Sequence, residues 1–371
     1  MNDAAVILAV EAQREAALEA MRFVHAHPEL AHEERECSAY LCTVLERAGL
    51  EVESGVAGME TAFRATLRGG RAGRSVGLAA LYDAVATVRP DGSLEPVHSC
   101  GHGLISGGVL GAALALASMR RELPGTLVVL GCPADEIHAP GTRERGGGKL
   151  LSAAAGAWDA LDAALYVHPE FEDTVQLRSR WMRRERARVF GARSLAGAPQ
   201  PPLDAAHALI HALGAFAPSD VLLERLELDG DVEEGTGLVL AAEILVFADD
   251  EADLERRTAE MRATVPEAEW RAGPTVEGVR PDAAVTAAVR EAFLALGRGF
   301  REDPDPLPFA TDFGNVSRRI PAALVGVGRP GGWSFHSDEG ARQFASAAGE
   351  EASLAIARVL ALAAARLLEP A

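Results

Sequence analysis

The sequence predicts an α/β protein with a mostly parallel central sheet, interrupted by a small inserted α+β domain. Short β-rich runs alternate with helical stretches in the first half of the chain, which is typical of a parallel sheet covered by helices. Near 181 a segment begins that reads as strand, helix, strand, strand, helix. We therefore expect the main domain over 1–180 and 281–371, and the inserted domain over 181–280.

Hydrophobic spacing and turn residues place the individual elements. In the main domain we expect helices over 3–27, 33–48, 104–121, 148–157, 282–297 and 341–368, and strands over 61–68, 75–82, 126–132, 162–167 and 322–328. In the inserted domain we expect a strand from 181, helices over 203–215 and 250–264, strands over 221–228 and 236–247, and a return linker around 271–282.

Charge and composition exclude several kinds of partner. The 371 residues include 36 basic and 54 acidic side chains, and the net charge of −18 repels nucleic acid and anionic membrane surfaces. No apolar run reaches the roughly 18 residues of a membrane span, and the N-terminus lacks the basic start of a signal peptide. Four cysteines in a chain of this length do not form a secreted disulfide framework. We expect a cytoplasmic protein with a small-molecule substrate and with neither nucleic acid nor membrane as a partner.

Chemically capable side chains collect where the predicted strands end. Asp83 follows one strand, Asp135 and Glu136 follow the next, and His168 follows a third. The carboxyl ends of parallel strands meet at one edge of the sheet, where α/β proteins bind their ligands. These side chains are therefore expected to share one site.

Two further segments add metal-binding residue types to this edge. Cys100 and His102 lie in SCGHG, just before a Gly-rich helix start, and His336 ends a Gly-rich loop in the last part of the chain. A cysteine two residues from a histidine is by itself most often packing. Together with Glu136 and His168, however, they form the thiolate, imidazole and carboxylate set that binds zinc and related divalent ions.

The acidic pair Asp135 and Glu136 suggests a division of roles. Successive side chains at a strand end point to opposite sides, so one carboxylate is expected on an ion and the other beside the attacking water as a general base. A solvated acidic turn is the alternative for an isolated pair. Here the pair follows the apolar strand TLVVLGCPA, which favours the functional interpretation.

Other motifs are weaker indicators of function. His207 and His211 lie four residues apart on a predicted helix but lack the glutamate of HExxH. The GGGK turn at Lys149 lacks the first glycine and the Ser or Thr of a phosphate-binding loop. His98 and His138 lie close to the ligand segments, where contacts with the ligands or with substrate are open to them.

Taken together, these segments resemble the dinuclear metallopeptidases of clan MH, which include aminoacylases and glutamate-releasing carboxypeptidases. The nearer branch holds amidohydrolases similar to p-aminobenzoyl-glutamate hydrolase and the Xaa-Arg dipeptidases. The matching segments are HAHPELAHEE at 25–34, YDA at 82–84, HSCGHGLISGGVLGAALALA at 98–117, GTLVVLGCPADE at 125–136, GGGKLLSAAAGAWDALDAALYVHP at 146–169 and TDFGNVSRRIPA at 311–322. The resemblance implies a catalytic domain with an inserted lid or dimerisation domain, two divalent ions per chain (Zn²⁺ or Mn²⁺), and leaves a homodimer or higher homo-oligomer open.

The resemblance also assigns ligands to the two ions. Cys100 matches the bridging ligand, Glu136 and His336 match the other ligands of one ion, and His102 and His168 match those of the second. These are metal assignments by position, carried over from the family.

Three more positions take roles from the resemblance. Asp83 would orient His102 as a carboxylate behind the ligand. Asp135 occupies the place of the family's glutamate general base. Lys149 matches the lysine that closes the family's GGGK turn, for which the sequence supplies no role.

The departures from the family pattern concern substrate recognition. Asp135 is one methylene shorter than the usual glutamate, and the loop IHAPGTRER after it is longer than usual. Leu195 stands where the family has a lid histidine, commonly from a partner subunit, that stabilises the oxyanion during amide attack. Candidates for a replacement donor are His138, Arg143, Arg145 and Asn315.

Three functions remain open from the sequence. The first is a metal-dependent hydrolase that cleaves the C–N amide bond of a small N-acyl amino acid or dipeptide-like substrate. The second is an aminohydrolase that releases ammonia from a small non-peptide, such as an activated aromatic amine, and needs no oxyanion histidine. The third is a catalytically silent metal-binding homologue, which Asp135 and Leu195 permit.

Overall fold

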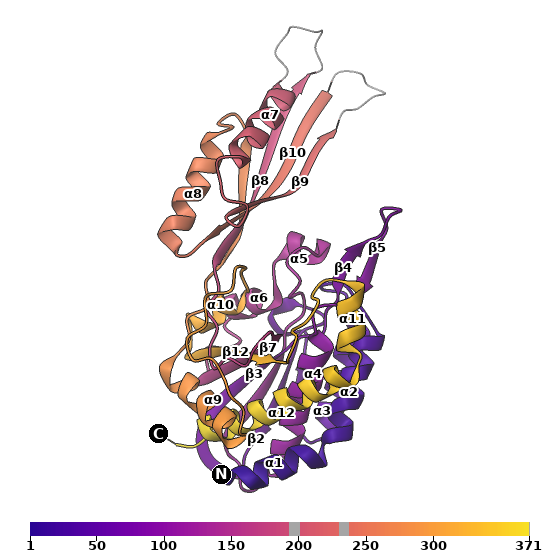
Figure 1. The fold of residues 1–371 in the computed structure, drawn as a ribbon, viewed down its shortest axis with the longest axis vertical. Coiled ribbons are helices and arrows are strands. Elements are labelled where there is room, and N and C mark those ends of the chain that lie inside the picture. The colour runs from indigo at the N-terminus through magenta and orange to yellow at the C-terminus, as the bar shows by residue number, and fades with distance from the viewer. Residues whose placement is uncertain (193–200, 230–236, 371) are drawn as a thin grey trace. The chain divides into compact units, whose positions relative to one another are not determined.

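The computed structural model describes residues 1–192, 201–229 and 237–370. They form two compact units, each with its own sheet (Figure 1). Unit 1 comprises Met1–Arg178, Val279–Asp305 and Asp312–Ala371, and unit 2 comprises Ser179–Gly278 and Pro306–Thr311.

The sheet of unit 1 has six strands. They are β1 (Glu51–Ser54), β2 (Phe63–Arg68), β3 (Arg71–Ala80), β6 (Pro124–Gly131), β7 (Ala163–Glu170) and β12 (Ala322–Gly328), in the order β1-β2-β6-β3-β7-β12. The last four of this order run parallel, whereas β2 is antiparallel to both its neighbours. The predicted α/β class with a mostly parallel central sheet is thus confirmed. A hairpin of β4 (Val85–Val88) and β5 (Leu94–Val97) follows β3 and has no counterpart in the sequence prediction.

Helices surround this sheet, and one of them is almost wholly buried. The helices are α1 (Asp3–Ala12), α2 (Arg14–Ala26), α3 (Arg35–Arg47), α4 (His102–Ser118), α5 (Pro140–Arg145), α6 (Gly148–Ala154), α9 (Ala283–Ala295), α10 (Phe313–Ser317), α11 (Asp338–Phe344) and α12 (Ala347–Leu367). α4 packs against α2 and α12. A Cβ on Gly108 of α4 would lie 2.2 Å from Cγ2 of Ile356 in α12, so glycine is what permits this close approach. No described helix is long and apolar enough to cross a membrane.

Two predicted single helices are each broken in the structure. The helix expected over 3–27 stops at Ala12 and restarts at Arg14, because Gln13 has φ −100° and ψ 8°. The helix expected over 341–368 is divided at Ser346, whose extended backbone (φ −86°, ψ 171°) starts α12 afresh. Hydrophobic spacing continues across both breaks, so the periodicity alone did not reveal them.

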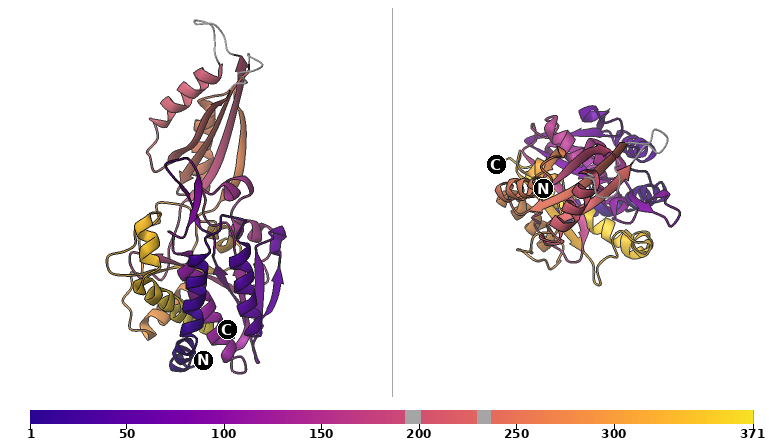
Figure 2. Two further views of the ribbon diagram at one scale, coloured as in Figure 1. Left: turned by 90° about the vertical axis from the view of Figure 1, so that its right-hand side faces the viewer. Right: turned by 90° about the horizontal axis from the view of Figure 1, so that it is seen from above.

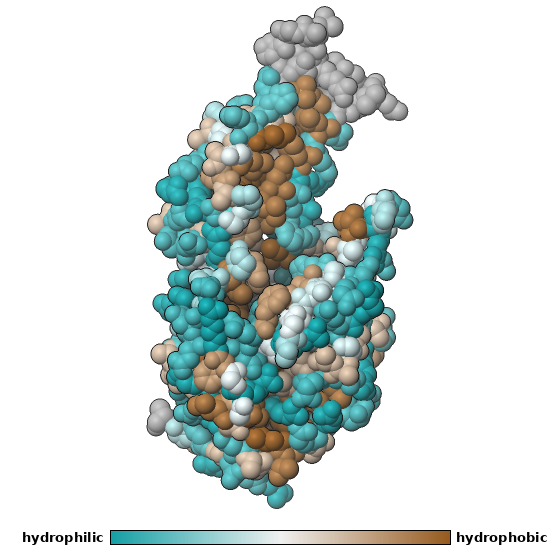
Figure 3. Space-filling model, viewed as in Figure 1, coloured by the Kyte–Doolittle hydropathy of each residue, from teal (hydrophilic) through white to brown (hydrophobic). Residues whose placement is uncertain are grey.

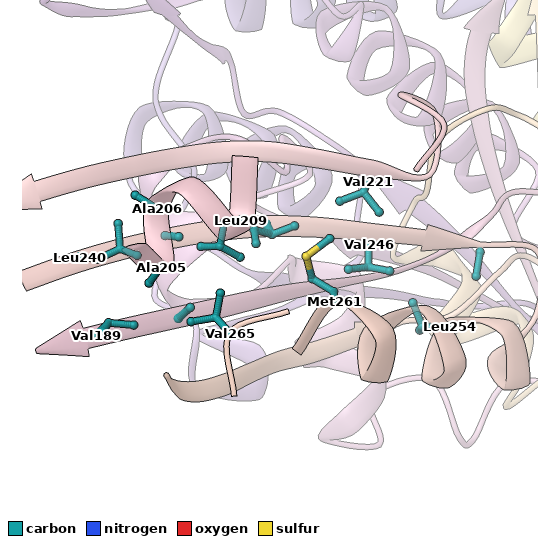
Figure 4. Packing of buried hydrophobic residues seen from close by; sticks show 14 of the residues in the cluster. Val189, Ala205, Ala206, Leu209, Val221, Leu240, Val246, Leu254, Met261 and Val265 are labelled. Carbon is teal, nitrogen blue, oxygen red and sulfur yellow. The ribbon is translucent and has the colours of Figure 1, made fainter. Parts of the chain in front are cut away.

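The described residues of unit 2 form a four-stranded antiparallel sheet with two helices. Its elements are β8 (Trp181–Ala192), α7 (Pro201–Leu213), β9 (Val221–Asp229), β10 (Gly237–Ala248), α8 (Glu251–Ala263) and β11 (Glu269–Val276), with strand order β11-β8-β10-β9. Leu209 of α7 and Met261 of α8 point toward strand residues such as Leu240 and Val246 (Figure 4). The predicted inserted α+β architecture therefore has a core of its own.

The predicted return linker around 271–282 is partly wrong. Glu269–Val276 forms β11, which pairs with β8 along the edge of the sheet. Gly273 and Pro274 suggested a linker, but the register shifts between Ala272 and Thr275, and this irregularity takes up both residues. An edge strand tolerates a proline at such a bulge because one side of it needs no hydrogen bonds.

Apolar side chains remain on the surface of unit 2. Brown residues gather on the face of this unit seen in Figure 3. The exposed large apolar side chains described in the unit are Phe190, Ile210, Leu222, Leu228 and Phe309. Single apolar side chains are ordinary on protein surfaces, so these five need no partner to explain them.

The first and last parts of the chain meet in unit 1. α1 packs against α12, and the amino group of Met1 donates to Oε1 of Glu369 over 2.8 Å (Figure 2). The C-terminal part of the main domain therefore packs against its N-terminal part.

Glu34 links three segments of unit 1 through hydrogen bonds. This fully buried carboxylate accepts hydrogen bonds from the backbone N–H groups of His32 and Ala134, each at 2.9 Å, and from the Thr61 hydroxyl at 2.8 Å. Burial first, and the charge of Asp83 second, raise the pKa of Glu34 to about 7, against the effect of these hydrogen bonds. The segment that leads to Asp135 is thus attached to a titrating group.

The raised pKa of Glu34 predicts a pH dependence of stability. Between its ordinary value of 4.5 and about 7 the folded state holds this proton more tightly than the unfolded state. The free energy of unfolding should therefore fall as pH rises through this window. Glu34→Gln should show a smaller fall than the parent in denaturant unfolding between about pH 5 and about pH 8.

The control is Glu60→Gln, which changes an exposed glutamate paired with Arg35. It should keep the slope of the parent. Equal slopes in Glu34→Gln and the parent would contradict the assignment.

Candidate metal centre

Four separate segments of unit 1 bring the predicted ligands together. Cys100 and His102 lie at the start of α4, and His168 lies within the last residues of β7. Glu136 lies in the loop after β6, and His336 in the loop between β12 and α11. The sequence rule that ligands gather beyond the carboxyl ends of parallel strands therefore describes this site.

The ligand atoms form two groups that share one sulfur. Cys100, His102 and His168 make one group, and Cys100, Glu136 and His336 make the other, with all ligand atoms in a group within 4.8 Å of one another. Sγ of Cys100 lies 3.6 Å from Nε2 of His168, and Nε2 of His336 lies 3.8 Å from Oε2 of Glu136. This division is the one that the family resemblance implied.

Two buried atoms inside the cluster have no hydrogen-bond partner among the described residues. They are Nε2 of His102 and Oε1 of Glu136, which lie 3.7 Å apart. A buried polar atom without a partner is costly, and a divalent cation in each ligand group would satisfy one of these two atoms. The donor set and its orphaned atoms thus fit a metal pair.

Neighbouring charges support the thiolate form of Cys100. Burial acts to raise the pKa of this thiol, but the charge of His102, together with hydrogen bonds from His168 and His336, outweighs burial. They hold the pKa of Cys100 well below its usual value. Thiolate is the form that binds a metal ion.

The histidines of the first group are oriented from behind. Nδ1 of His102 lies 2.7 Å from the carbonyl oxygen of Asp83 and 2.9 Å from its Oδ1. Nδ1 of His168 lies 2.8 Å from the carbonyl oxygen of Pro169 and 3.3 Å from Oε1 of Glu170. These contacts leave Nε2 of each ring facing the cluster, as in metal sites where a carboxylate or carbonyl fixes the ring.

The structure corrects the argument made for Asp135 and Glu136. β6 ends at Gly131, so neither residue is in a strand, and strand alternation does not direct their side chains. Instead Ala134 has φ 58°, and Glu136 donates its N–H to Oδ2 of Asp83 at 2.9 Å. Both carboxylates consequently approach Nε2 of His102, with Oδ2 of Asp135 at 3.4 Å and Oε1 of Glu136 at 3.7 Å.

A buried ion pair lies behind Asp135. Nζ of Lys149 contacts Oδ1 of Asp135 and lies 2.9 Å from Oδ1 of Asp312, and the hydroxyl of Tyr166 is 3.4 Å from Oδ2 of Asp135. Burial acts to raise the pKa of Asp135, but the Lys149 ammonium and His102 lower it strongly. Asp312, Tyr166 and Glu170 were not among the predicted site residues; each lies in or beside a quoted family segment, which is the only signal the sequence offered.

The predicted substrate contacts lie apart in the chain. His138 precedes α5, Arg143 and Arg145 lie in α5, and Asn315 lies in α10. His138 belongs to neither ligand group found among the described residues. Leu195 lies outside the described residues, so all five roles stay predictions.

Comparison with known sequences gives a consistent result. A profile of Peptidase family M20/M25/M40 matches residues 78–364. The Xaa-Arg dipeptidase of Mus musculus is 28% identical over 336 residues, which cover 81% of this chain and 73% of that protein. N-acetyl-L-cysteine deacetylase of Bacillus subtilis (strain 168) is 25% identical over 351 residues, which cover 85% and 80%.

Another relative matches over a shorter part. One of the p-aminobenzoyl-glutamate hydrolase subunits from Escherichia coli (strain K12) is 31% identical over 173 residues, which cover 44% of this chain. The match spans 34% of that protein, about a third of its length. The first two relatives therefore match most of this chain, whereas the third matches less than half of it.

Solved structures show the same fold. A dinuclear metal-binding peptidase of the M20 family from Bacillus subtilis has a TM-score of 0.69 at 21% identity, covering 96% of this chain and 99% of that one. The aminobenzoyl-glutamate utilization protein from Klebsiella pneumoniae has a TM-score of 0.72 at 14% identity, covering 96% and 97%. Together with the profile match over most of the sequence, these findings show that the chain belongs to peptidase family M20/M25/M40.

Proposed function

We propose that this protein is a metal-dependent hydrolase that cleaves the C–N amide bond of a small N-acyl amino acid or dipeptide-like substrate. The observation that carries the proposal is the pair of ligand groups that share Sγ of Cys100. The relatives support the substrate class, since their names refer to Xaa-Arg dipeptides, N-acetylcysteine and p-aminobenzoyl-glutamate.

Two divalent ions fit the residues present. Glu136 and His336 would hold one ion, His102 and His168 the other, and Cys100 both. Thiolate together with imidazole favours Zn²⁺, whereas the carboxylate also suits Mn²⁺, so we propose these two as the candidates. When bound, such a pair acidifies a water molecule and polarises the amide carbonyl.

Asp135 is placed to move the proton. Its Oδ2 faces His102 and is free of Lys149, which contacts the other oxygen. We assign to Oδ2 the removal of a proton from the attacking water and its delivery to the leaving amine, as one group acting first as base and then as acid. Asp83 keeps His102 turned toward the cluster during this step.

A second function is favoured by one residue of the sequence. Leu195 replaces the lid histidine that stabilises an amide oxyanion in the family pattern, and an aminohydrolase that releases ammonia from an activated aromatic amine needs no such donor. A screen of acyl amino acids, dipeptides and aromatic amines, read by mass spectrometry, separates the two functions. Acid and amine products support the amide hydrolase, and ammonia release supports the alternative.

Metal removal should abolish turnover. Chelation followed by dialysis is expected to leave an inactive protein, and Zn²⁺, Mn²⁺ or Co²⁺ should restore activity, because the metal pair would supply the acidified water that attacks the amide. Full activity in protein without detectable metal would contradict the assignment of these residues as a catalytic metal site.

Cys100→Ala should lower the affinity for metal strongly and lower the free energy of unfolding only slightly. The matched control is Cys132→Ala, which removes a buried thiol outside both ligand groups. Calorimetry with Zn²⁺ should show weaker binding for Cys100→Ala and parental binding for Cys132→Ala. Equal binding by both variants would contradict the ligand role of Cys100.

Asp135→Asn should keep metal and lose turnover. Loss of a general base lowers rates by about 10² to 10⁴, and asparagine has nearly the shape of aspartate. Turnover and bound metal are measured together, with Asp159→Asn as a control at an exposed carboxylate paired with Arg319. An Asp135→Asn variant as fast as the parent would remove Asp135 from the mechanism.

Leu195 predicts weak activity on common N-acetyl amino acids. Loss of one oxyanion donor costs on the order of 3 to 4 kcal/mol, so the protein should favour another substrate. Leu195→His should raise cleavage of acetylated amino acids without improving the best substrate found in the screen. Rapid cleavage of N-acetyl amino acids by the unmodified protein would show that Leu195 does not restrict the choice of substrate.

A further inference from the structure

Lys149 is the single lysine of the chain, and it is completely buried. It lies in the first turn of α6 (Gly148–Ala154), beside the ligand cluster but in neither ligand group. A buried ammonium needs paired charges to be stable. Its partners therefore indicate what it does.

Those partners are the buried carboxylate of Asp312, the partly exposed carboxylate of Asp135 and an aromatic ring. Nζ contacts Oδ1 of Asp135, lies 2.9 Å from Oδ1 of Asp312, and sits 4.9 Å from the centre of the Tyr166 ring. Oδ2 of Asp312 accepts the backbone N–H of Leu150 at 2.9 Å. Asp312 is thereby hydrogen-bonded to the helix that carries Lys149.

Two glycines bring this helix start against the loop of Asp135. A Cβ on Gly148 would lie 2.1 Å from the carbonyl oxygen of Pro133, and a Cβ on Gly147 would lie 2.3 Å from Oδ2 of Asp312. Gly148 donates its N–H to the same Pro133 carbonyl at 3.0 Å. The GGGK turn thus serves close docking of backbone on backbone, with Lys149 directed at Asp135.

We propose that Lys149 is a positioning residue for Asp135 and that Asp312 holds Lys149 in place. Lys149 occupies Oδ1 of Asp135, which leaves Oδ2 turned to His102, 3.4 Å away. Aspartate is shorter than glutamate by one methylene, so a fixed orientation replaces the reach that a longer side chain would have. This inference rests on the proposed function, in which Asp135 carries the proton.

The first test reads geometry and needs no substrate. Lys149→Met keeps side-chain length but removes the cation that faces Asp135 and the buried Asp312, so the double variant Lys149→Met/Asp312→Asn removes the buried negative charge to preserve folding. Crystal structures of the parent and the double variant, both loaded with Zn²⁺, should show the Asp135 carboxylate displaced in the variant. Zn²⁺ affinity by calorimetry should stay within about threefold of the parent, because no ligand is changed. An Asp135 carboxylate in its parental position would overturn the proposal.

The second test reads coupling in turnover of the substrate found in the screen. Lys149→Met and the double variant should lower kcat by about 10²-fold, the effect of a displacement near 1 Å, with KM almost unchanged. In an Asp135→Asn background, Lys149→Met should add less than about a threefold loss, because Lys149 acts through Asp135. Lys149→Arg should recover part of the rate. If Lys149→Met lowered kcat by the full factor of about 10² in the Asp135→Asn background as well, Lys149 would have a merely structural role.

Ser152→Ala is the matched control within the same helix. Ser152 donates to the carbonyl oxygen of Lys149 at 3.0 Å and accepts from Nε1 of Trp158 at 2.9 Å, without touching Asp135. It should lower the unfolding temperature and leave kcat unchanged; a loss of kcat as large as that of Lys149→Met would overturn the proposal. If Asp135→Asn itself turns over like the parent, the proposed role of Asp135 as the proton carrier fails, whereas an inactive Asp135→Asn beside a fully active Lys149→Met defeats this inference alone.

Discussion

The candidate centre depends on how the loop after β6 is held. Glu34 binds the N–H of Ala134 and Asp83 binds the N–H of Glu136, so a buried carboxylate fixes the backbone on each side of Asp135. Ala134 adopts φ 58°, a left-handed conformation that costs an alanine on the order of 1 kcal/mol or more. The two hydrogen bonds hold the loop in this conformation. As a result Asp135 and Glu136, neighbours in the chain, both reach the same histidine.

Charge is arranged around this loop in layers. The innermost layer is the ligand cluster, where the Cys100 thiolate and Glu136 favour cations. Behind it, Asp135 is compensated by Lys149, and Lys149 by Asp312. Buried ion pairs add little net stability compared with apolar packing of the same volume, but removal of one partner is strongly destabilising. Such an arrangement suits the proposed role of Asp135, which needs a fixed orientation, better than it suits stability.

Much of the centre could be predicted from sequence because parallel strands bring their carboxyl ends to one edge. Cys100, His102, Glu136, His168 and His336 are separated by long stretches of chain, yet strand-end position and residue type gathered them. The interactions behind the ligands were not accessible in the same way. The contact of Lys149 with Asp312 joins residues far apart in sequence, and no local pattern encodes it.

Local geometry explains the predictions that failed. The left-handed Ala134 replaced the strand alternation assumed for Asp135 and Glu136, since alanine gives no signal for such a conformation. Likewise the break at Gln13 has no Gly or Pro to mark it, and Gly273 with Pro274 marked a bulge in β11 rather than a linker. Residue type constrains these positions weakly, and the tertiary environment decides them.

The close packing of α4 has a consequence for motion. Glycines such as Gly108 let this helix sit against α12 with hardly any space between them, and fifteen of its side chains and glycine positions, from His102 to Leu116, are buried. Amide protons in such a helix exchange only when the whole unit opens, whereas exposed loops open far more often. His102 therefore lies in a tightly packed part of unit 1, whereas the side chain of His336 is 48% exposed in a loop. In the proposed centre, ion binding would then cost more side-chain entropy at His336 than at His102.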